Sequence, residues 1–324
     1  MFVHARTFAT IVAVVGSLAF AATASADEKY PVDTVTLVTH SSPGGGSDVY
    51  LREMIRFLAP VTGADFAVEN VKGGSGAKAI AKVATSPADG SIFYAATPTY
   101  INMSLLSNPD HSYRDVEPVV NFFLDPQVIY VRKDSSLHSL PDIIAAAKAS
   151  PGTQKWGTGS PASLERQALE KFKVLAGVDV TIITHDGGGD MMINVLNGSL
   201  DLGIGEIQEF RGQLDAGEVR IIGVFTEQRL SEFPDAKTAK EEGIDMVVNK
   251  LRGIVGPKGL SAEVIQAWEA AIPKVMEDPE FQKWYRAAAL VPAYMPHDKF
   301  APFVDGVVKE QEAFFKEYGI KTMD

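Results

Sequence analysis

The chain has 324 residues, of which 46% are hydrophobic and 22% charged, and its 41 acidic residues outnumber 30 basic ones to give a formal net charge of −11. This composition is typical of a globular protein and excludes a disordered, collagen-like or coiled-coil chain. The lack of cysteine excludes disulfides, thiol catalysis and iron–sulfur or zinc–thiolate sites. The excess of acid argues against nucleic acid or an anionic membrane surface as a partner, because both need a basic face.

Residues 1–26 are typical of a secretory signal peptide. His4 and Arg6 give a basic start, residues 8–22 are almost entirely apolar, and residues 24–26 are the small residues that a signal peptidase recognises. An apolar run of about 15 residues is short for a membrane span, so we expect export to the periplasm rather than a membrane anchor. The remaining length suggests two domains.

Strands and helices alternate through most of the chain. Because this βαβ order is typical of helices packed on a sheet, we expect a mostly parallel sheet. Three helices follow near the C-terminus, and their aromatic stripes predict core packing. The predicted strands are 35–39, 66–69, 92–96, 128–131, 180–184 and 220–225, and the predicted helices are 48–58, 77–84, 140–149, 164–176, 191–197, 264–275, 281–288 and 298–318.

A loop rich in glycine and serine occurs three times, at residues 41–48, 157–163 and 186–190. Each loop precedes a predicted helix, so its backbone N–H groups would lie at the positive end of a helix dipole, where proteins bind carboxylates and phosphates. The alternative is an ordinary turn in which Asp48 and Asp190 cap the helices. Because three such loops occur in one α/β chain, we favour an anion-binding site.

These loops lack the motifs of nucleotide-binding proteins and hydrolases. Ser47-Asp48 stands where a Walker loop needs Gly-Lys followed by Ser or Thr, and the glycine spacing of a dinucleotide site is missing. The nearest match to a hydrolase elbow, residues 73–77, ends in alanine. An exported α/β hydrolase with Ser75 or Ser160 as nucleophile is therefore only an alternative. We expect no catalytic residue, no metal and no cofactor.

His40 and His185 each stand at the end of a predicted strand, just before a glycine loop. They could face a common cleft and bind a carboxylate, or they could be ordinary polar residues at strand ends. Asp48 and Asp190 would repel an anion at this site. We therefore hypothesise that they favour a ligand that carries hydroxyl or amino groups.

Several short blocks follow one another along nearly the whole chain after residue 40. They are Pro43-Gly44-Gly45 with Asp48 and Arg52, Val68-Glu69-Asn70 before Gly73-Gly74-Ser75-Gly76, Pro87-Ala88-Asp89-Gly90, Gly157-Thr158-Gly159-Ser160, Gly187-Gly188-Gly189, Leu196-Asn197-Gly198-Ser199-Leu200-Asp201, Glu242-Gly243 and Gly253-Ile254-Val255-Gly256-Pro257. In these blocks the chain resembles the extracytoplasmic solute receptors of the tripartite tricarboxylate transporters, the Bug proteins.

The resemblance implies a type II periplasmic-binding-protein fold, with two α/β domains and a ligand cleft between them. Domain 1 would comprise residues 27–127 and 228–324, and domain 2 residues 128–227. Members of this family hold a ligand carboxylate through backbone groups and waters of two turns, one from each domain. The matching positions, with candidate cleft walls, are Pro43, Gly44, Gly45, Ser47, Asp48, Thr97, Pro98, Thr158, Gly159, Ser160, His185, Gly187, Gly188, Gly189 and Asp190.

This sequence departs from the family pattern at two places. His185 and Asp186 replace a common aromatic and basic pair, and Leu251 and Arg252 replace a common aromatic residue. The backbone anchor should survive these changes, but the selectivity of the pocket is open. Arg252 could reach a second carboxylate, although we favour a solvated charge.

The function that the resemblance implies is that of a non-enzymatic, monomeric periplasmic receptor. Such a receptor captures a small organic carboxylate, such as a di- or tricarboxylate, a hydroxy acid or an aromatic acid. It then delivers this ligand to the integral membrane subunits of a tripartite transporter. A receptor of the same fold that serves a signalling partner is the alternative.

Overall fold

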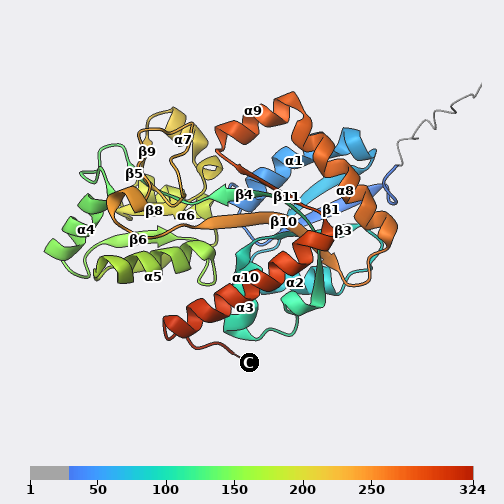
Figure 1. Cartoon of the computed structure of the whole chain (residues 1–324), viewed down its shortest axis with the longest axis horizontal. Helices are drawn as coiled ribbons and strands as arrows, with labels where there is room; N and C mark the ends of the chain where they lie inside the picture. The colour runs from blue at the N-terminus through green and yellow to red at the C-terminus, as the bar shows by residue number, and fades with distance from the viewer. Residues whose placement is uncertain (1–28, 324) are drawn as a thin grey trace, which may run out of the picture.

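The strands of the chain form two separate sheets (Figure 1). The computed structural model describes residues 29–323, so the predicted signal peptide lies outside the described residues. The six-stranded sheet has the order β11-β4-β10-β3-β1-β2, and the five-stranded sheet has the order β7-β6-β8-β5-β9. Their bounds are β1 Thr34–Thr39, β2 Asp65–Asn70, β3 Ile92–Ala96, β4 Val116–Pro126, β5 Val128–Arg132, β6 Lys155–Thr158, β7 Thr181–Thr184, β8 Leu202–Gly205, β9 Val219–Val224, β10 Asn249–Pro257 and β11 Val291–Met295.

Helices cover both sheets, as the alternating pattern predicts, and the α/β fold class is confirmed. Three helices, at 77–84, 140–149 and 164–176, begin and end at the predicted residues. With the six-stranded sheet lie α1 (Gly46–Thr62), α2 (Ala77–Ala84), α3 (Pro98–Ser107), α8 (Ala262–Glu277), α9 (Pro279–Ala287) and α10 (His297–Glu317), and with the five-stranded sheet α4 (Leu140–Ala149), α5 (Leu164–Ala176), α6 (Gly188–Leu196) and α7 (Arg211–Asp215).

The prediction of a mostly parallel sheet is wrong. Each sheet has a parallel part, β3-β1-β2 in one and β7-β6-β8 in the other, but the remaining neighbours pair antiparallel. The reason is that the chain crosses between the sheets twice. It leaves the first along β4 and enters the second as β5, and it returns along β10, which pairs antiparallel with β4 over its whole length. In Figure 1 these two strands run side by side between the two lobes.

Both faces of each sheet are buried, which explains the apolar runs in the central strands. In β1, Leu37 packs in a core with Trp268 on one face, and Val38 packs with Tyr94 on the other. The five-stranded sheet likewise has a core on each face. Because helices cover these faces, the loops that follow the strands gather at the sheet ends, where the two sheets face each other.

Candidate functional site

Four helices begin at one small cavity between the two sheets. They are α1 and α3, from the six-stranded sheet, and α5 and α6, from the five-stranded sheet. The lining residues include His40, Ser41, Gly46, Ser47, Thr99, Gly159, Ser160, Ser163, Glu165, Asp186, Gly187, Gly188, Glu209 and Lys250. All three glycine-rich loops predicted from the sequence therefore reach the same place. The positive ends of four helix dipoles make this cavity suited to an anionic group.

The cavity is small in this arrangement. Its volume is about 30 Å³, which is room for only a water or two. Pro43 is exposed on one side of the cleft, and Gly189 lies opposite it on the other side. The two backbones are so close that a Cβ placed on Gly189 would lie 2.6 Å from the carbonyl oxygen of Pro43. Lys72 adds ion pairs across the cleft, 3.0 Å to Asp186 and 3.7 Å to Asp190.

The loop before α1 is held in shape by Asp48. Its carboxylate accepts hydrogen bonds from the N–H of Gly44 (2.9 Å), from Arg52 Nε (2.9 Å) and from Asn70 Nδ2 (3.0 Å). Burial opposes ionisation of Asp48, but these hydrogen bonds hold its pKa below the ordinary value. Gly44 has a φ of 80°, which only glycine adopts at low cost. Asp48 therefore shapes the loop, and Gly45 closes it by donating to Ser42 O.

The helices α3 and α5 begin with side-chain caps. The buried Thr97 accepts a hydrogen bond from the N–H of Thr99 (3.3 Å), and Pro98 is the first residue of α3. Ser163 caps α5 by accepting from the N–H of Arg166 (3.1 Å), and its hydroxyl lies 3.5 Å from that of Thr158. Ser160 Oγ is buried without a hydrogen-bond partner in the described chain.

The two histidines differ in position. His40 lines the cavity, and its Nδ1 lies 2.5 Å from the hydroxyl of Tyr94. Burial, together with Lys250 and Arg252, lowers the pKa of His40 to about 3, so its imidazole is neutral near neutral pH. His185 instead contacts Thr158 O through Nδ1 (3.2 Å) and is outside the set that lines the cavity.

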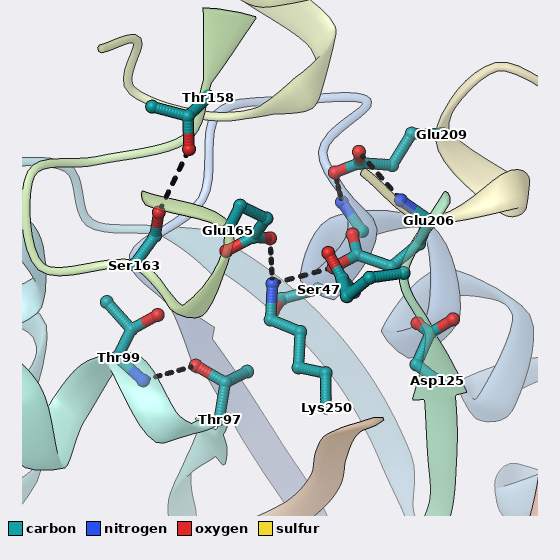
Figure 2. Close-up of polar contacts among 12 residues, drawn as sticks. Ser47, Thr97, Thr99, Asp125, Thr158, Ser163, Glu165, Glu206, Glu209 and Lys250 are labelled. Carbon is teal, nitrogen blue, oxygen red and sulfur yellow. Dashed lines mark hydrogen bonds and ion pairs between the residues drawn. The ribbon is translucent and has the colours of Figure 1, made fainter. Parts of the chain in front are cut away.

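A buried network of charges joins the two sheets below the cavity (Figure 2). Lys250, on β10, donates to Glu165 of α5 and to Glu206 Oε1 (2.8 Å), which follows β8. Arg252, two residues along β10, pairs with Asp125 Oδ2 of β4 (2.8 Å) and with Glu206 Oε2 (3.0 Å). These five side chains therefore connect the crossing strands to the five-stranded sheet.

The expectation that Arg252 is a solvated charge is wrong. Its side chain is completely buried, and it also donates to Ser47 Oγ (2.9 Å), which places it directly behind the start of α1. A guanidinium is buried at tolerable cost only where carboxylates compensate its charge. Asp125 and Glu206 do so here.

The acids of this network are held in different states. Burial raises the pKa of Asp125 to about 7 despite the neighbouring Arg252. For Glu206 the attraction of Lys250 and Arg252 outweighs burial and lowers the pKa well below its ordinary value. Burial and the nearby Glu206 raise the pKa of Glu209 well above its ordinary value. The same cluster therefore shifts the pKa values of Glu206 and Glu209 in opposite directions.

Sequence reasoning missed Glu165, Glu206, Glu209 and Lys250. One signal was available: Lys250 and Arg252 stand two residues apart in a run that is otherwise apolar, and a period of two places both on one face of a strand. To predict this strand, one would have had to assign a segment that contains two charged residues and two glycines to the buried interior.

Within residues 29–323, no helix is long and apolar enough to cross a membrane. The same residues also have no group of three or more His, Cys, Asp or Glu side chains placed to hold a metal ion.

Comparisons of the sequence and of the structure with known proteins point to the same family. The sequence profile described as "Tripartite tricarboxylate transporter family receptor" matches residues 52–320. The chain is 26% identical to the UPF0065 protein in the gbd 5′ region of Cupriavidus necator, over 98% of this chain and 97% of that protein. It is 24% identical to Protein BugT of Bordetella pertussis, over 98% of each chain. A solved structure, R. palustris Rpa4515 with adipate, superposes with a TM-score of 0.84 at 24% identity, over 90% of this chain and 99% of that one, which shows a shared fold.

Proposed function

The chain belongs to the receptor family of the tripartite tricarboxylate transporters, the Bug proteins, and we propose that it captures a small organic carboxylate in the cleft between its two sheets. The observation that carries the proposal is the convergence of four helix N-termini on one cavity. Their N–H groups are dipolar donors that need no cationic side chain. A chain of net charge −11 can bind a small anion at such a site.

The ligand-binding residues belong to this proposal. The backbone of the loops before α1 and α6 would hold the carboxylate, and the starts of α3 and α5 would form the walls. The proposed positions, among which Asp48 acts by holding the loop in shape, are Pro43, Gly44, Gly45, Ser47, Asp48, Thr97, Pro98, Thr158, Gly159, Ser160, His185, Gly187, Gly188, Gly189 and Asp190. Among them, Ser47, Gly159, Ser160, Gly187 and Gly188 line the cavity directly.

Ligand entry requires the two sheets to separate. A cavity of about 30 Å³ does not admit an organic acid, so the arrangement described above corresponds to a closed cleft. The proposed domains, residues 27–127 with 228–324 and residues 128–227, meet at the crossing segments beside β4 and β10. Rotation there would open the cleft, and a ligand that contacts both sides would favour closure.

The wider role follows from the family. We propose that residues 1–26 direct export to the periplasm, that the protein acts there as a monomer without catalysing a reaction, and that it delivers its ligand to integral membrane subunits of a tripartite transporter. The similar structure of Rpa4515 is a structure with adipate, which is consistent with a carboxylate as the transported class.

A thermal-shift screen tests the proposal. The mature protein would be heated with dicarboxylates, tricarboxylates, hydroxy acids and aromatic acids, and with matched uncharged amides as controls. A ligand at 100 times its dissociation constant should stabilise the fold by about 2.7 kcal/mol. Stabilisation by one class of acid but not by its amide supports the proposal. A flat response to every acid at millimolar concentration would contradict it.

A further inference from the structure

A second hollow, which we call the α5–α10 groove, lies outside the cavity of the proposed site. Its volume is about 430 Å³, and none of the residues that line it lines the cavity. In Figure 1 both of its helices lie below β10. The residues that form its walls recur every three or four positions along one face of α5 and one face of α10, and they include Leu164, Gln167, Lys171, Phe303, Val307 and Gln311.

The α5–α10 groove has a largely apolar lining. Leu251 of β10 and Met246 of the segment before it contribute, together with Phe303 and Phe314 of α10. Sites for small molecules have volumes of about 300–1,000 Å³ and linings of this kind, with a few polar groups that fix the orientation of the ligand. The two phenylalanine rings favour an aromatic ligand, because aromatic rings pack well on one another.

Two amide side chains of the groove are buried without partners. Gln167, on α5, is 7% exposed, and Gln311, on α10, is 8% exposed. Neither Nε2 of Gln167 nor Oε1 of Gln311 has a hydrogen-bond partner in the described chain. A buried polar atom that stays unpartnered lowers stability. Because both amides line the groove, a molecule bound there can supply an acceptor for Gln167 and a donor for Gln311.

The charged residues of the groove disfavour an anion. Lys171 is half-buried, and Glu310 and Glu317 are exposed, so one cation stands against two acids. A carboxylate would gain no net attraction from this set, whereas an uncharged molecule is not repelled by it. The groove therefore suits a different chemical class from the ligand of the cleft.

We propose that the α5–α10 groove is a second ligand site, which binds an uncharged aromatic molecule that carries an amide or lactam group. The N–H of this group donates to Gln311 Oε1, and its carbonyl oxygen accepts from Gln167 Nε2. The aromatic body packs between the two helices, against Leu164 and Phe303. Because α5 lies with the five-stranded sheet and α10 with the six-stranded one, the molecule contacts both lobes. This inference goes beyond the proposed function and does not depend on it.

Saturation-transfer NMR titrations with two lactams test the inference. Quinolin-2-one carries both the N–H donor and the carbonyl acceptor, and 1-methylquinolin-2-one has the same ring and carbonyl without the donor. The titrations compare mature wild type, Gln167→Leu, Gln311→Leu and the control Gln213→Leu, whose side chain is on α7 outside the groove. Leucine is close to glutamine in size, so replacing an unpartnered buried amide by it should leave the fold intact, and thermal unfolding checks this.

We expect quinolin-2-one to bind wild type with a dissociation constant of about 1 mM or tighter, as the ligand efficiency of small molecules predicts. The 1-methyl compound should bind about tenfold more weakly, because it leaves Gln311 Oε1 without a donor. In Gln311→Leu this preference should nearly disappear, since the acceptor is gone. Gln167→Leu should weaken both lactams by about fivefold, and Gln213→Leu should change neither affinity.

Four results would overturn the inference. They are no binding of quinolin-2-one at millimolar concentration, equal affinity of wild type for both lactams, a wild-type preference in Gln311→Leu, and unchanged affinities in Gln167→Leu. Should one glutamine variant not fold, the other variant and the preference of wild type decide. Because no residue lines both the groove and the cavity, failure of the groove proposal leaves the proposed function unaffected.

Discussion

Replacing Gly189 by alanine should weaken ligand binding by preventing full closure of the cleft. A Cβ at this position would lie 2.6 Å from Pro43 O on the opposite side, about 0.8 Å closer than an ordinary contact of 3.4 Å. The opposing atom belongs to the backbone, so it cannot rotate away. The two sides must therefore separate, and overpacking of this kind costs about 1–3 kcal/mol. That cost corresponds to a ligand affinity about 5 to 150 times weaker.

The open protein should tolerate the same substitution. Gly189 is in the first turn of α6, where alanine has the higher helix propensity. The assay is calorimetry with the carboxylate that gives the largest shift in the thermal screen. Gly306→Ala is the matched control, because a Cβ there meets no atom of the described chain within 4 Å. If a folded Gly189→Ala variant binds the carboxylate as tightly as wild type does, then ligand binding does not require the two turns to meet.

Three further predictions concern the groups around the cavity. Lys250→Met should lower the free energy of unfolding at pH 8 by about 3–5 kcal/mol in urea denaturation, because the buried Glu165 loses its cation and Glu206 loses one of its two; a loss below about 1 kcal/mol contradicts this role. Because the pKa of His40 is about 3 in the folded state and about 6.5 in the unfolded state, His40 should lower the stability of wild type by about 1.6 kcal/mol between pH 6.5 and 5. His40→Asn should remove this loss and the exposed His138→Asn should keep it; equal slopes in all three would contradict the assignment. Asp48→Asn should cost about 1–2 kcal/mol of stability by weakening the loop contacts, with little effect on which carboxylate binds best; a changed ligand ranking would instead place Asp48 at the ligand.

Local patterns predicted much of this structure. The helix at 164–176 has its predicted bounds because its signals are all local to it: an apolar face along its length, the cap Ser163 just before its start and Gly177 just after its end. The family resemblance, rather than the local pattern, implied that the loops at 41–48 and 186–190 meet in one cleft, and both loops reach the same cavity.

Features that depend on distant partners could not be predicted in this way. Lys250 is buried because Glu165, 85 residues away, and Glu206, 44 residues away, supply its counter-charges. The sequence favours a solvated Arg252 for the same reason, since its partner Asp125 is 127 residues distant. Glu209, which follows β8, contacts Gly46 at the start of α1 across 163 residues of sequence. Nothing in the sequence near residue 209 indicates that contact.

The crossing strands explain the error in sheet topology. β10 contains two cations, two glycines and a terminal proline, which argue locally against a buried strand. Its neighbours β3 and β4 nevertheless bury it completely beyond Asn249.

A crystal structure of the mature protein with the tightest-binding carboxylate from the thermal screen would locate the ligand directly. We expect the carboxylate carbon to lie between the two sheets, with its oxygens within hydrogen-bond distance of backbone N–H groups at the start of at least one of α1, α3, α5 and α6. A carboxylate held elsewhere, such as in the α5–α10 groove lined by Leu164 and Phe303, would contradict this expectation.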